Sequence, residues 1–238
     1  MIIIPARIAS NRFPNKVLAD INGLPMVVAT AKRVEDIDEV VIATDSPKVI
    51  DVAKKYNIKA VKTLDIHKSG TDRINEAASI MGVDKNEIIV NVQADEPFVE
   101  PEVVNAVFNR VKIALENSEP FMMVSCYKKI NSVFANDPNH VKVIIDHEGY
   151  AIYFSRSKIP FDTEGHNSYF GHLGIYGFTG ATLEKFCTLG VSPLEEIEKL
   201  EQLRAIYFGK KIPMVKVESK SFGIDTKEDL KKAVSMFM

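Results

Sequence analysis

The first candidates for chemistry are three cationic side chains that follow the opening apolar run of the sequence. Arg7, Arg12 and Lys16 occur within one short stretch, with Ser10 and Asn11 among them. Guanidinium and ammonium groups bind phosphate, and the main-chain N–H groups of a loop can add to them. The stretch contains no glycine, so it is neither a Walker A loop nor a GxGxxG turn. It is predicted to bind an anion with its side chains, although cationic loop residues are more often simply solvated.

Two aspartates are candidate metal ligands because each is expected in a turn at the end of a strand. Asp95 comes just after the apolar run 87–93, and Asp225 lies in the turn 221–226 before the last expected helix. Mg²⁺ usually takes one or two protein carboxylates and completes its octahedron with phosphate oxygens and water. Together with the cationic loop, the two aspartates would form a metal–polyphosphate site. A simple helix-capping role is the alternative for Asp225.

Further polar residues lie where a structural role is the simpler interpretation. Arg73 is in the first turn of an expected helix, where the helix dipole disfavours a cation, which leaves a bound anion or an ordinary surface position. Arg156 and His172 flank apolar strand segments. Glu201 and Gln202 fall on an expected long helix, where they would ordinarily count as part of a solvated face.

Apolar runs that alternate with helical patterns predict the elements that position these residues. Short apolar runs are typical of strands buried on both faces. Their alternation with helices implies βαβ units and a parallel sheet, which binds ligands at the carboxyl ends of its strands. The first strand is expected to end before Pro5, which has no N–H to donate. The expected strands are 1–4, 39–45, 58–62, 87–93 and 121–127, and the expected helices are 26–34, 49–56, 74–81 and 101–115.

The pattern changes beyond about residue 128, where antiparallel strands are expected. The runs 141–146 and 151–156 are separated by a short polar stretch that contains glycine, which is typical of a hairpin. The residue patterns therefore predict an α/β chain with a mostly parallel sheet and an antiparallel lobe in its second half. The remaining expected elements are strands at 171–178 and 214–217 and helices at 182–189, 193–208 and 227–236.

The composition argues against several classes of protein. The 238 residues suffice for one sizeable α/β core, with 46% hydrophobic and 26% charged residues. A formal net charge of −2 gives no overall basic field for nucleic acid or an anionic membrane. No apolar run approaches the length of a membrane span and no signal peptide is recognised, so a cytoplasmic protein is expected. Cys126 and Cys187 are expected to pack in the core.

Several motifs together resemble the sugar-activating cytidylyltransferases. The segment 3–16 resembles the signature loop of that family, and later segments resemble the branch that activates 3-deoxy-manno-octulosonate (Kdo). Ile8 and Ala9 stand where acylneuraminate enzymes usually carry Gly-Gly, which argues against sialic acid. Ala94 stands where the family often has glycine. The later segments are 91–97, 153–156, 172–177, 200–204 and 223–226.

The resemblance implies a Rossmann-like nucleotidyltransferase sheet in a single domain over residues 1–238. The nucleotide-binding core would comprise about 1–128 and 210–238, and the sugar-binding and dimerisation lobe about 129–209. Members of this branch transfer CMP from CTP to Kdo, giving CMP-Kdo and pyrophosphate for lipopolysaccharide synthesis. A homodimer in the cytoplasm of a Gram-negative bacterium would follow, without nucleic-acid or membrane partners.

The resemblance also implies a role for each candidate residue. Asp95 and Asp225 would hold Mg²⁺, and Arg7 and Lys16 would join them in catalysis. Two alternatives stay open: a cytidylyltransferase for a related sugar acid, such as an amino-substituted Kdo or a sialic-type acid, and a non-catalytic nucleotide-binding protein on the same fold. CTP would be bound by Pro5, Ala6, Arg7, Ser10, Arg12, Lys16, Arg73 and Gln93, and Kdo by Arg156, His172, Tyr176, Glu201 and Gln202.

Overall fold

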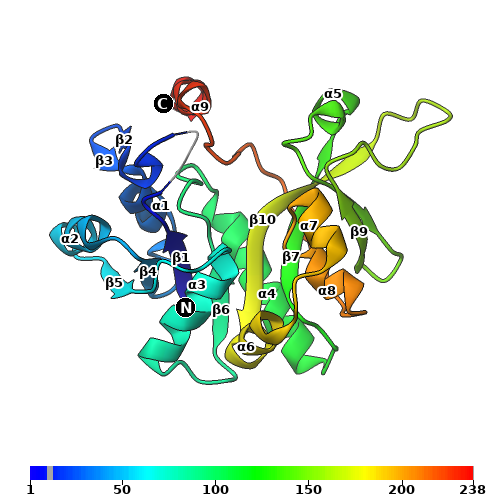
Figure 1. The fold of residues 1–238 in the computed structure, drawn as a ribbon. Helices are drawn as coiled ribbons and strands as arrows, with labels where there is room; N and C mark the ends of the chain where they lie inside the picture. Colours follow the sequence, from blue (N-terminus) through cyan, green and yellow to red (C-terminus); the bar gives the residue numbers. More distant parts are fainter. Residues whose placement is uncertain (10–12, 238) are drawn as a thin grey trace.

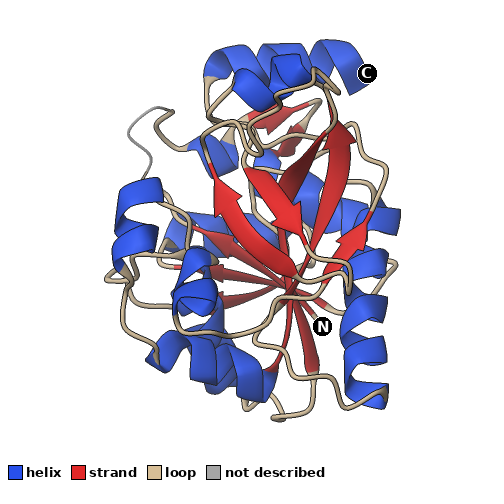
Figure 2. Cartoon of the chain, turned by 90° about the vertical axis from the view of Figure 1, so that its right-hand side faces the viewer, coloured by secondary structure: helices blue, strands red, loops and turns tan. Residues whose placement is uncertain are grey.

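The computed structural model describes residues 1–9 and 13–237, and its centre is one twisted sheet with helices on both faces (Figures 1 and 2). Over the described residues this sheet has nine strands, of which seven lie in the order β11–β7–β10–β6–β1–β4–β5, and β8 and β9 extend it from β10. β6, β1, β4 and β5 run parallel, whereas β10 runs antiparallel to both of its neighbours, β6 and β7. This confirms the predicted mostly parallel sheet with antiparallel strands in the second half. The strands are β1 (Ile2–Ala6), β4 (Val40–Thr44), β5 (Lys59–Lys62), β6 (Ile88–Asn91), β7 (Val124–Ile130), β8 (Lys142–Ile145), β9 (Ala151–Ser155), β10 (Tyr169–Thr179) and β11 (Met214–Lys216).

Helices cover both faces because neighbouring residues of the parallel strands point to opposite sides. Ile2 and Ile4 pack on one face with residues of α1, α2 and α4, while Ile3 packs on the other face with residues of α3, α6 and α8. All three isoleucines are fully buried, as an unbroken apolar strand predicts. The helices are α1 (Met26–Val34), α2 (Pro47–Lys55), α3 (Gly70–Met81), α4 (Pro101–Glu116), α5 (Ser132–Asn136), α6 (Gly180–Thr188), α7 (Pro193–Glu198), α8 (Leu203–Tyr207) and α9 (Lys227–Phe237).

The carboxyl ends of β1 and β6 meet where the order of the strands reverses. The chain places β4 on one side of β1 and later crosses to place β6 on the other side. In an open α/β sheet, ligands bind at such a switch point. The last helix, α9, packs near this end of the sheet against β2 (Asp20–Ile21) and the start of α1 (Figure 1). The fold therefore brings the last residues of the chain to the strand ends from which the first loop departs.

The predicted end of the first strand is wrong, because β1 continues through Pro5 to Ala6. β1 pairs with β4 along its whole length, but with β6 only at Ile2 and Ile3. Main-chain groups alternate between the two neighbours, and the carbonyl of Ile3 faces β6, so the nitrogen of Pro5 also points to that side. The pairing between β1 and β6 has already ended at Pro5, so the absence of an N–H on Pro5 costs no hydrogen bond.

The predicted helix 193–208 is also wrong, because the chain forms two short helices with a break between them. Lys199 ends α7 with φ 54°, a left-handed conformation that no helix continues. Arg204 of α8 then folds back on Glu195 of α7, with Nε at 2.9 Å and Nη2 at 2.7 Å from the two carboxylate oxygens. The break turns Glu201 and Gln202 inward, where a continuous helix would have left them on its outer face.

Several short elements escaped the sequence analysis because they are too brief for a periodic pattern. They are η1 (Lys16–Leu18), β2, β3 (Leu24–Pro25) and α5. Among the described residues, no helix combines the length and the apolarity needed to cross a bilayer. Cys126 is buried in the core as expected, and Cys187 is half-buried, with both thiols free.

Candidate active site

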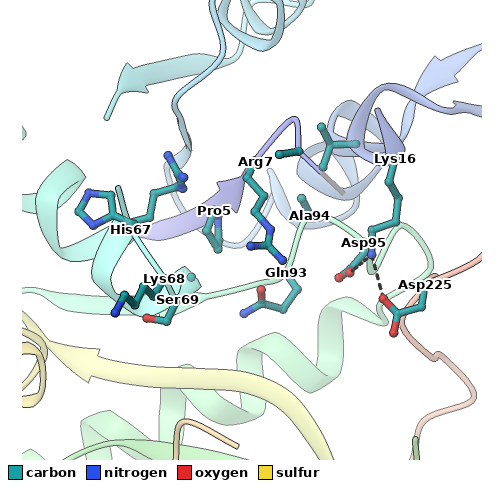
Figure 3. A pocket seen from close by; sticks show the side chains of 14 residues that line it. Pro5, Arg7, Lys16, His67, Lys68, Ser69, Gln93, Ala94, Asp95 and Asp225 are labelled. Atoms are coloured by element: carbon teal, nitrogen blue, oxygen red, sulfur yellow. Dashed lines mark hydrogen bonds and ion pairs between the residues drawn. The ribbon is translucent and has the colours of Figure 1, made fainter. Parts of the chain in front are cut away.

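A pocket of about 520 Å³ opens at the carboxyl ends of β1 and β6 (Figure 3). Its wall combines the loop after β1, the start of α3, the loop after β6 and the segment before α9. Of the predicted site residues, Pro5, Arg7, Lys16, Arg73, Gln93, Asp95 and Asp225 line this pocket. Ala6 is buried at the end of β1 instead, and the predicted residues Ser10 and Arg12 lie outside the described part of the chain.

Lys16 bridges the two candidate metal ligands (Figure 3). Its Nζ lies 2.6 Å from Oδ2 of Asp95 and 3.1 Å from Oδ1 of Asp225. Burial alone would lower the pKa of Lys16, but the charges and hydrogen bonds of Asp95 and Asp225 outweigh it, so this pKa is raised. The ammonium group therefore keeps its proton at neutral pH and holds the two carboxylates together.

The two carboxylates fit a magnesium ion that receives its other ligands from a substrate. They already share one cation, the Lys16 ammonium, so one oxygen of each reaches a common position. Over residues 1–9 and 13–237, no group of three or more His, Cys, Asp and Glu side chains is arranged to hold a metal ion. Mg²⁺ is commonly bound through one or two carboxylates, with phosphate oxygens and water completing the octahedron. The donor set therefore suits a metal ion that is completed by a polyphosphate.

Asp225 reaches the pocket because its segment is tied to the loop after β6 and to the start of α9. The N–H of Ile224 donates to the carbonyl oxygen of Asp95 at 2.9 Å. Oδ2 of Asp229 accepts from the N–H groups of Asp225 at 3.1 Å and of Thr226 at 2.8 Å. In return, Oγ1 of Thr226 accepts from the N–H of Asp229 at 3.1 Å, so Thr226 caps α9. The capping alternative for Asp225 is thus wrong, and its carboxylate turns into the pocket.

The start of α3 forms another wall of the pocket and supplies main-chain donors. Ser69 caps this helix by accepting from the N–H of Asp72 at 3.0 Å. A Cβ atom on Gly70 would lie 3.1 Å from Cγ of Pro5 and 3.4 Å from Oε1 of Gln93. A side chain there would push the helix away from β1, so glycine permits the close approach. Helix N-termini attract phosphate through their N–H groups and dipole, and this one complements the cationic loop.

Arg73 has partners within the protein. Its Nη1 donates to Oγ1 of Thr63 at 2.6 Å and to the carbonyl of Leu64 at 3.1 Å, and its Nη2 lies 3.4 Å from Oδ2 of Asp45. The side chain is buried, so the predicted surface position is wrong, and no bound anion is needed to explain its charge. Arg73 nevertheless lines the pocket, where part of it can contact a ligand.

Several predicted sugar-binding residues form a hydrogen-bonded group behind the start of α3. Thr71 donates through Oγ1 to Oε1 of Glu201 at 2.6 Å, and Tyr176 donates through its hydroxyl to Oε1 of Gln202 at 3.1 Å. Burial raises the pKa of Glu201 against the opposing hydrogen bond from Thr71. Nε2 of Gln202 is buried and has no hydrogen-bond partner within the described residues, which leaves a donor for a ligand hydroxyl or water. The interpretation of Glu201 and Gln202 as a solvated face is therefore wrong.

His172 lies beside this group on β10. Its Nε2 is 2.9 Å from Oγ of Ser125, and its ring packs against Phe154 and Tyr176, with centroid distances of 4.9 Å and 5.6 Å. Burial lowers the pKa of His172 to about 3, so the ring is neutral at physiological pH. A neutral imidazole can exchange hydrogen bonds with a hydroxyl group but cannot neutralise a carboxylate.

The neutral state of His172 predicts that the protein loses stability as the pH falls. Its pKa is about 3 in the folded protein and about 6.5 in an unfolded chain, so unfolding takes up a proton between these values. Between pH 7.5 and pH 5.5, the free energy of unfolding should fall by about 1 kcal/mol more in the wild type than in His172→Gln. Urea denaturation at the two pH values measures this difference. His147→Gln, at an exposed position, is the control and should keep the wild-type pH dependence. Identical pH dependence in the wild type and His172→Gln would contradict a neutral ring at His172.

Arg156 directly follows β9, contacts the end of α7 and is not among the residues that line the pocket. Its Nε donates to the carbonyl of Glu198 at 2.7 Å, and Nη1 and Nη2 donate to the carbonyls of Pro138 at 3.1 Å and Lys199 at 3.4 Å. These bonds hold the break between α7 and α8 in place. A direct contact of Arg156 with a sugar carboxylate stays a prediction.

Residues of the pocket that were not predicted from the sequence include His67 and Lys68. The ring Nε2 of His67 is hydrogen-bonded to Oε2 of Glu76, which fixes the side chain against α3. A signal was present, because an unbroken run of polar and small residues from 67 to 73 precedes an apolar helical pattern. Such a run is where a loop delivers polar groups to the start of a helix.

The chain is similar to known proteins in sequence and in structure. A family model described as cytidylyltransferase matches residues 1–212. A 3-deoxy-manno-octulosonate cytidylyltransferase from a Nitratiruptor species is 56% identical over 237 residues, which cover 100% of this chain and 99% of that protein. The protein of the same name from Wolinella succinogenes is 50% identical over 241 residues, with 100% and 99% covered.

A solved structure shows the same arrangement of the chain. The structure of CMP:2-keto-3-deoxy-manno-octonic acid synthetase complexed with CTP matches with a TM-score of 0.89 at 33% identity, covering 99% of this chain and 96% of that one. The matches in sequence and in structure each extend over almost the whole length of both chains. The chain therefore belongs to the cytidylyltransferase family, in the branch of the 3-deoxy-manno-octulosonate cytidylyltransferases.

Proposed function

We propose that this protein transfers CMP from CTP to Kdo, giving CMP-Kdo and pyrophosphate, with Mg²⁺ as its metal ion. The observation that carries the proposal is the meeting of Lys16, Asp95 and Asp225 in one pocket at the switch point of the sheet. That arrangement suits a metal-bound triphosphate. The names of the relatives supply the sugar acid, and the similar structure solved with CTP supplies the nucleotide.

The proposed reaction is a substitution at the α-phosphorus of CTP, so the protein mainly positions two substrates and stabilises charge. The anomeric hydroxyl oxygen of Kdo bonds to the α-phosphorus, the bond to pyrophosphate breaks, and the hydroxyl proton is released. Asp95 and Asp225 would hold Mg²⁺, which when bound neutralises phosphate charge and lowers the pKa of the attacking hydroxyl. Arg7 and Lys16 would neutralise charge on the leaving pyrophosphate.

The proposed place of each substrate rests on the residues that line the pocket and on those behind it. Gln93 and Arg73 line the pocket near the start of α3 and would face the base and the ribose. Kdo would lie toward Glu201 and Gln202, because Glu201 accepts a hydrogen bond from Thr71 of α3, the residue after Gly70 of the pocket wall. The unpartnered amide of Gln202 would then donate to a sugar hydroxyl.

We also propose that the protein works as a homodimer in the cytoplasm of a Gram-negative bacterium and supplies lipopolysaccharide synthesis. The support for these points is the resemblance of the sequence to its family. The antiparallel strands of the segment 129–209 are the proposed dimer face.

The test of the proposed function is pyrophosphate release by the purified protein. CTP, UTP, ATP and GTP are each offered with a panel of 2-keto sugar acids, and CTP with Kdo should react fastest. Chelation of divalent cations with EDTA should abolish turnover, and added MgCl₂ should restore it. Faster turnover with an amino-substituted Kdo or a sialic-type acid would change the assigned sugar. Binding of CTP without pyrophosphate release would identify a non-catalytic nucleotide-binding protein.

A further inference from the structure

The segment that carries Asp225 has to be held in place by groups outside itself. Residues 217–226, between β11 and α9, form neither helix nor strand. Yet Oδ1 of Asp225 must lie within 3.1 Å of the Lys16 ammonium, beside Asp95. An irregular segment has no helix or sheet hydrogen bonds to fix a carboxylate at such a position, so side chains of other elements have to bind its main chain.

Glu100 is the first such side chain. It is the residue before α4, but its carboxylate does not cap that helix. Instead, Oε2 accepts from Oγ of Ser219 at 2.8 Å, and Oε1 accepts from the N–H groups of Lys220 at 2.7 Å and Ser221 at 3.3 Å. These bonds lower the pKa of Glu100 against the effect of its partial burial, so the carboxylate is ionised. The Glu100 carboxylate thus accepts hydrogen bonds from donors of all three residues 219–221.

Lys128 of β7 binds main-chain acceptors of the same stretch, those of Ser219 and Ser221. Its Nζ donates to the carbonyl oxygens of Ser219 at 3.2 Å and Ser221 at 3.1 Å. Burial lowers the pKa of Lys128 against the attraction of Glu96 and Glu100. Lys129, the next residue of the strand, is exposed to solvent, whereas Lys128 is half-buried. We call Glu100 and Lys128 together the 219–221 clamp.

The clamp is linked to the metal site through the loop after β6. Asp95 and Glu100 lie on that one loop, and the carbonyl of Asp95 accepts from the N–H of Ile224 at 2.9 Å. Between the two ties, Gly223 lies against Glu96: a Cβ on it would be 3.3 Å from Oε1 of Glu96. The segment before Asp225 is therefore bound to the loop after β6 at two places: residues 219–221 bind Glu100, and Ile224 binds Asp95.

We propose that Glu100 and Lys128 are positioning residues that set the place of Asp225 relative to Asp95, and through it the affinity of this pair for a divalent cation. Neither side chain is among the residues that line the pocket, so they act through the 219–221 main chain. The expected effect on turnover rests on the proposed function, whereas the effects on cation affinity and on the segment itself do not.

The experiment compares Lys128→Met with its neighbour Lys129→Met, which loses the same charge from an exposed position of the same strand. Mn²⁺ binding to the nucleotide-free protein is measured by electron paramagnetic resonance, and amide hydrogen exchange is followed over residues 217–226. Lys128→Met should weaken Mn²⁺ binding and lower kcat, each by about tenfold, with KM for CTP within about twofold. The amides of Ile224 and Asp225 should exchange faster, although Lys128 bonds to neither. Lys129→Met should match the wild type, and Lys128→Arg should recover most of the loss.

Glu100 is tested in the same way, with the exposed Glu102 of α4 as its matched control. Glu100→Ala should weaken Mn²⁺ binding and Glu102→Ala should not, and Glu100→Gln, which keeps an acceptor oxygen, should lie between. If Lys128→Met or Glu100→Ala does not fold, Glu100→Gln is the variant compared with the wild type. Unchanged Mn²⁺ affinity and unchanged exchange at Ile224 and Asp225 in the folded variants would overturn the proposal. Absence of pyrophosphate release by the wild type would overturn the proposed function alone, because binding and exchange need no turnover.

Discussion

Replacement of Asp95 or Asp225 by asparagine is expected to lower kcat by about a thousandfold, with KM for CTP changed only a few-fold. Asparagine keeps the shape of the side chain but removes the negative charge that a magnesium ligand needs. A thousandfold loss corresponds to about 4 kcal/mol of transition-state stabilisation, in the range that a metal ion supplies. CTP should still bind, because the start of α3 and the cationic loop contribute separately to the pocket. Steady-state kinetics of pyrophosphate release give both constants.

The double variant tests whether one ion uses both carboxylates. If Asp95 and Asp225 hold the same cation, replacing both should be little worse than replacing either, because the ion is lost at the first step. Glu218→Gln removes an exposed carboxylate from the same segment and should leave both constants unchanged. Near-normal turnover in either single variant would overturn the metal assignment.

Replacement of Lys16 by methionine is expected to act in opposite directions on catalysis and on cation binding. With CTP bound, the ammonium would neutralise the leaving pyrophosphate, so its loss should lower kcat by about a hundredfold. Without nucleotide, the same ammonium occupies the position between Asp95 and Asp225, at 2.6 Å and 3.1 Å from their oxygens. Its removal takes away a competing cation, so Mn²⁺ should bind the nucleotide-free variant more tightly than the wild type.

A lower kcat together with tighter Mn²⁺ binding in Lys16→Met would distinguish competition for the cation position from a general loss of structure. Mn²⁺ titration followed by paramagnetic resonance measures the affinity, and pyrophosphate release measures the rate. Lys48→Met, on the exposed side of α2, should change neither. Lys16→Arg keeps a cation between the carboxylates and should not tighten Mn²⁺ binding. If Lys16→Met binds Mn²⁺ no better than the wild type, Lys16 does not compete for the cation position in solution.

The sequence was informative wherever the evidence was local. The run Ile2–Ile4 has no polar residue, and such a strand can only be stable when both of its faces are covered. The strand ends then identify the loops that carry polar groups, and Lys16 and Asp95 follow two of those ends. The motifs of these loops also indicated the family, which the comparisons confirmed.

The sequence was misleading wherever a distant partner overrode a local pattern. The periodic stretch 193–208 breaks because Arg204 pairs with Glu195 and Glu201 is drawn to Thr71, 130 residues earlier. A surface position looked possible for Arg73 because Asp45 and Thr63, its partners, lie on another part of the chain. Pro5 looked like the end of a strand because it has no N–H to donate. Only the pairing of the strands shows that its nitrogen points toward β6 beyond the last paired residues, where no hydrogen bond is lost.

The sequence by itself determined the alternation of strands and helices, the buried β1 strand, and the residue types of the proposed phosphate and metal site. The tertiary structure decided that β10 enters the sheet between β6 and β7, and that Thr226 caps α9 in place of Asp225. It also decided that Lys16 meets partners 79 and 209 residues away. The physical reason is that hydrophobic periodicity and capping act between near neighbours in the chain. The distance between two carboxylates is set instead by loops such as 217–226, whose shape depends on side chains from other elements.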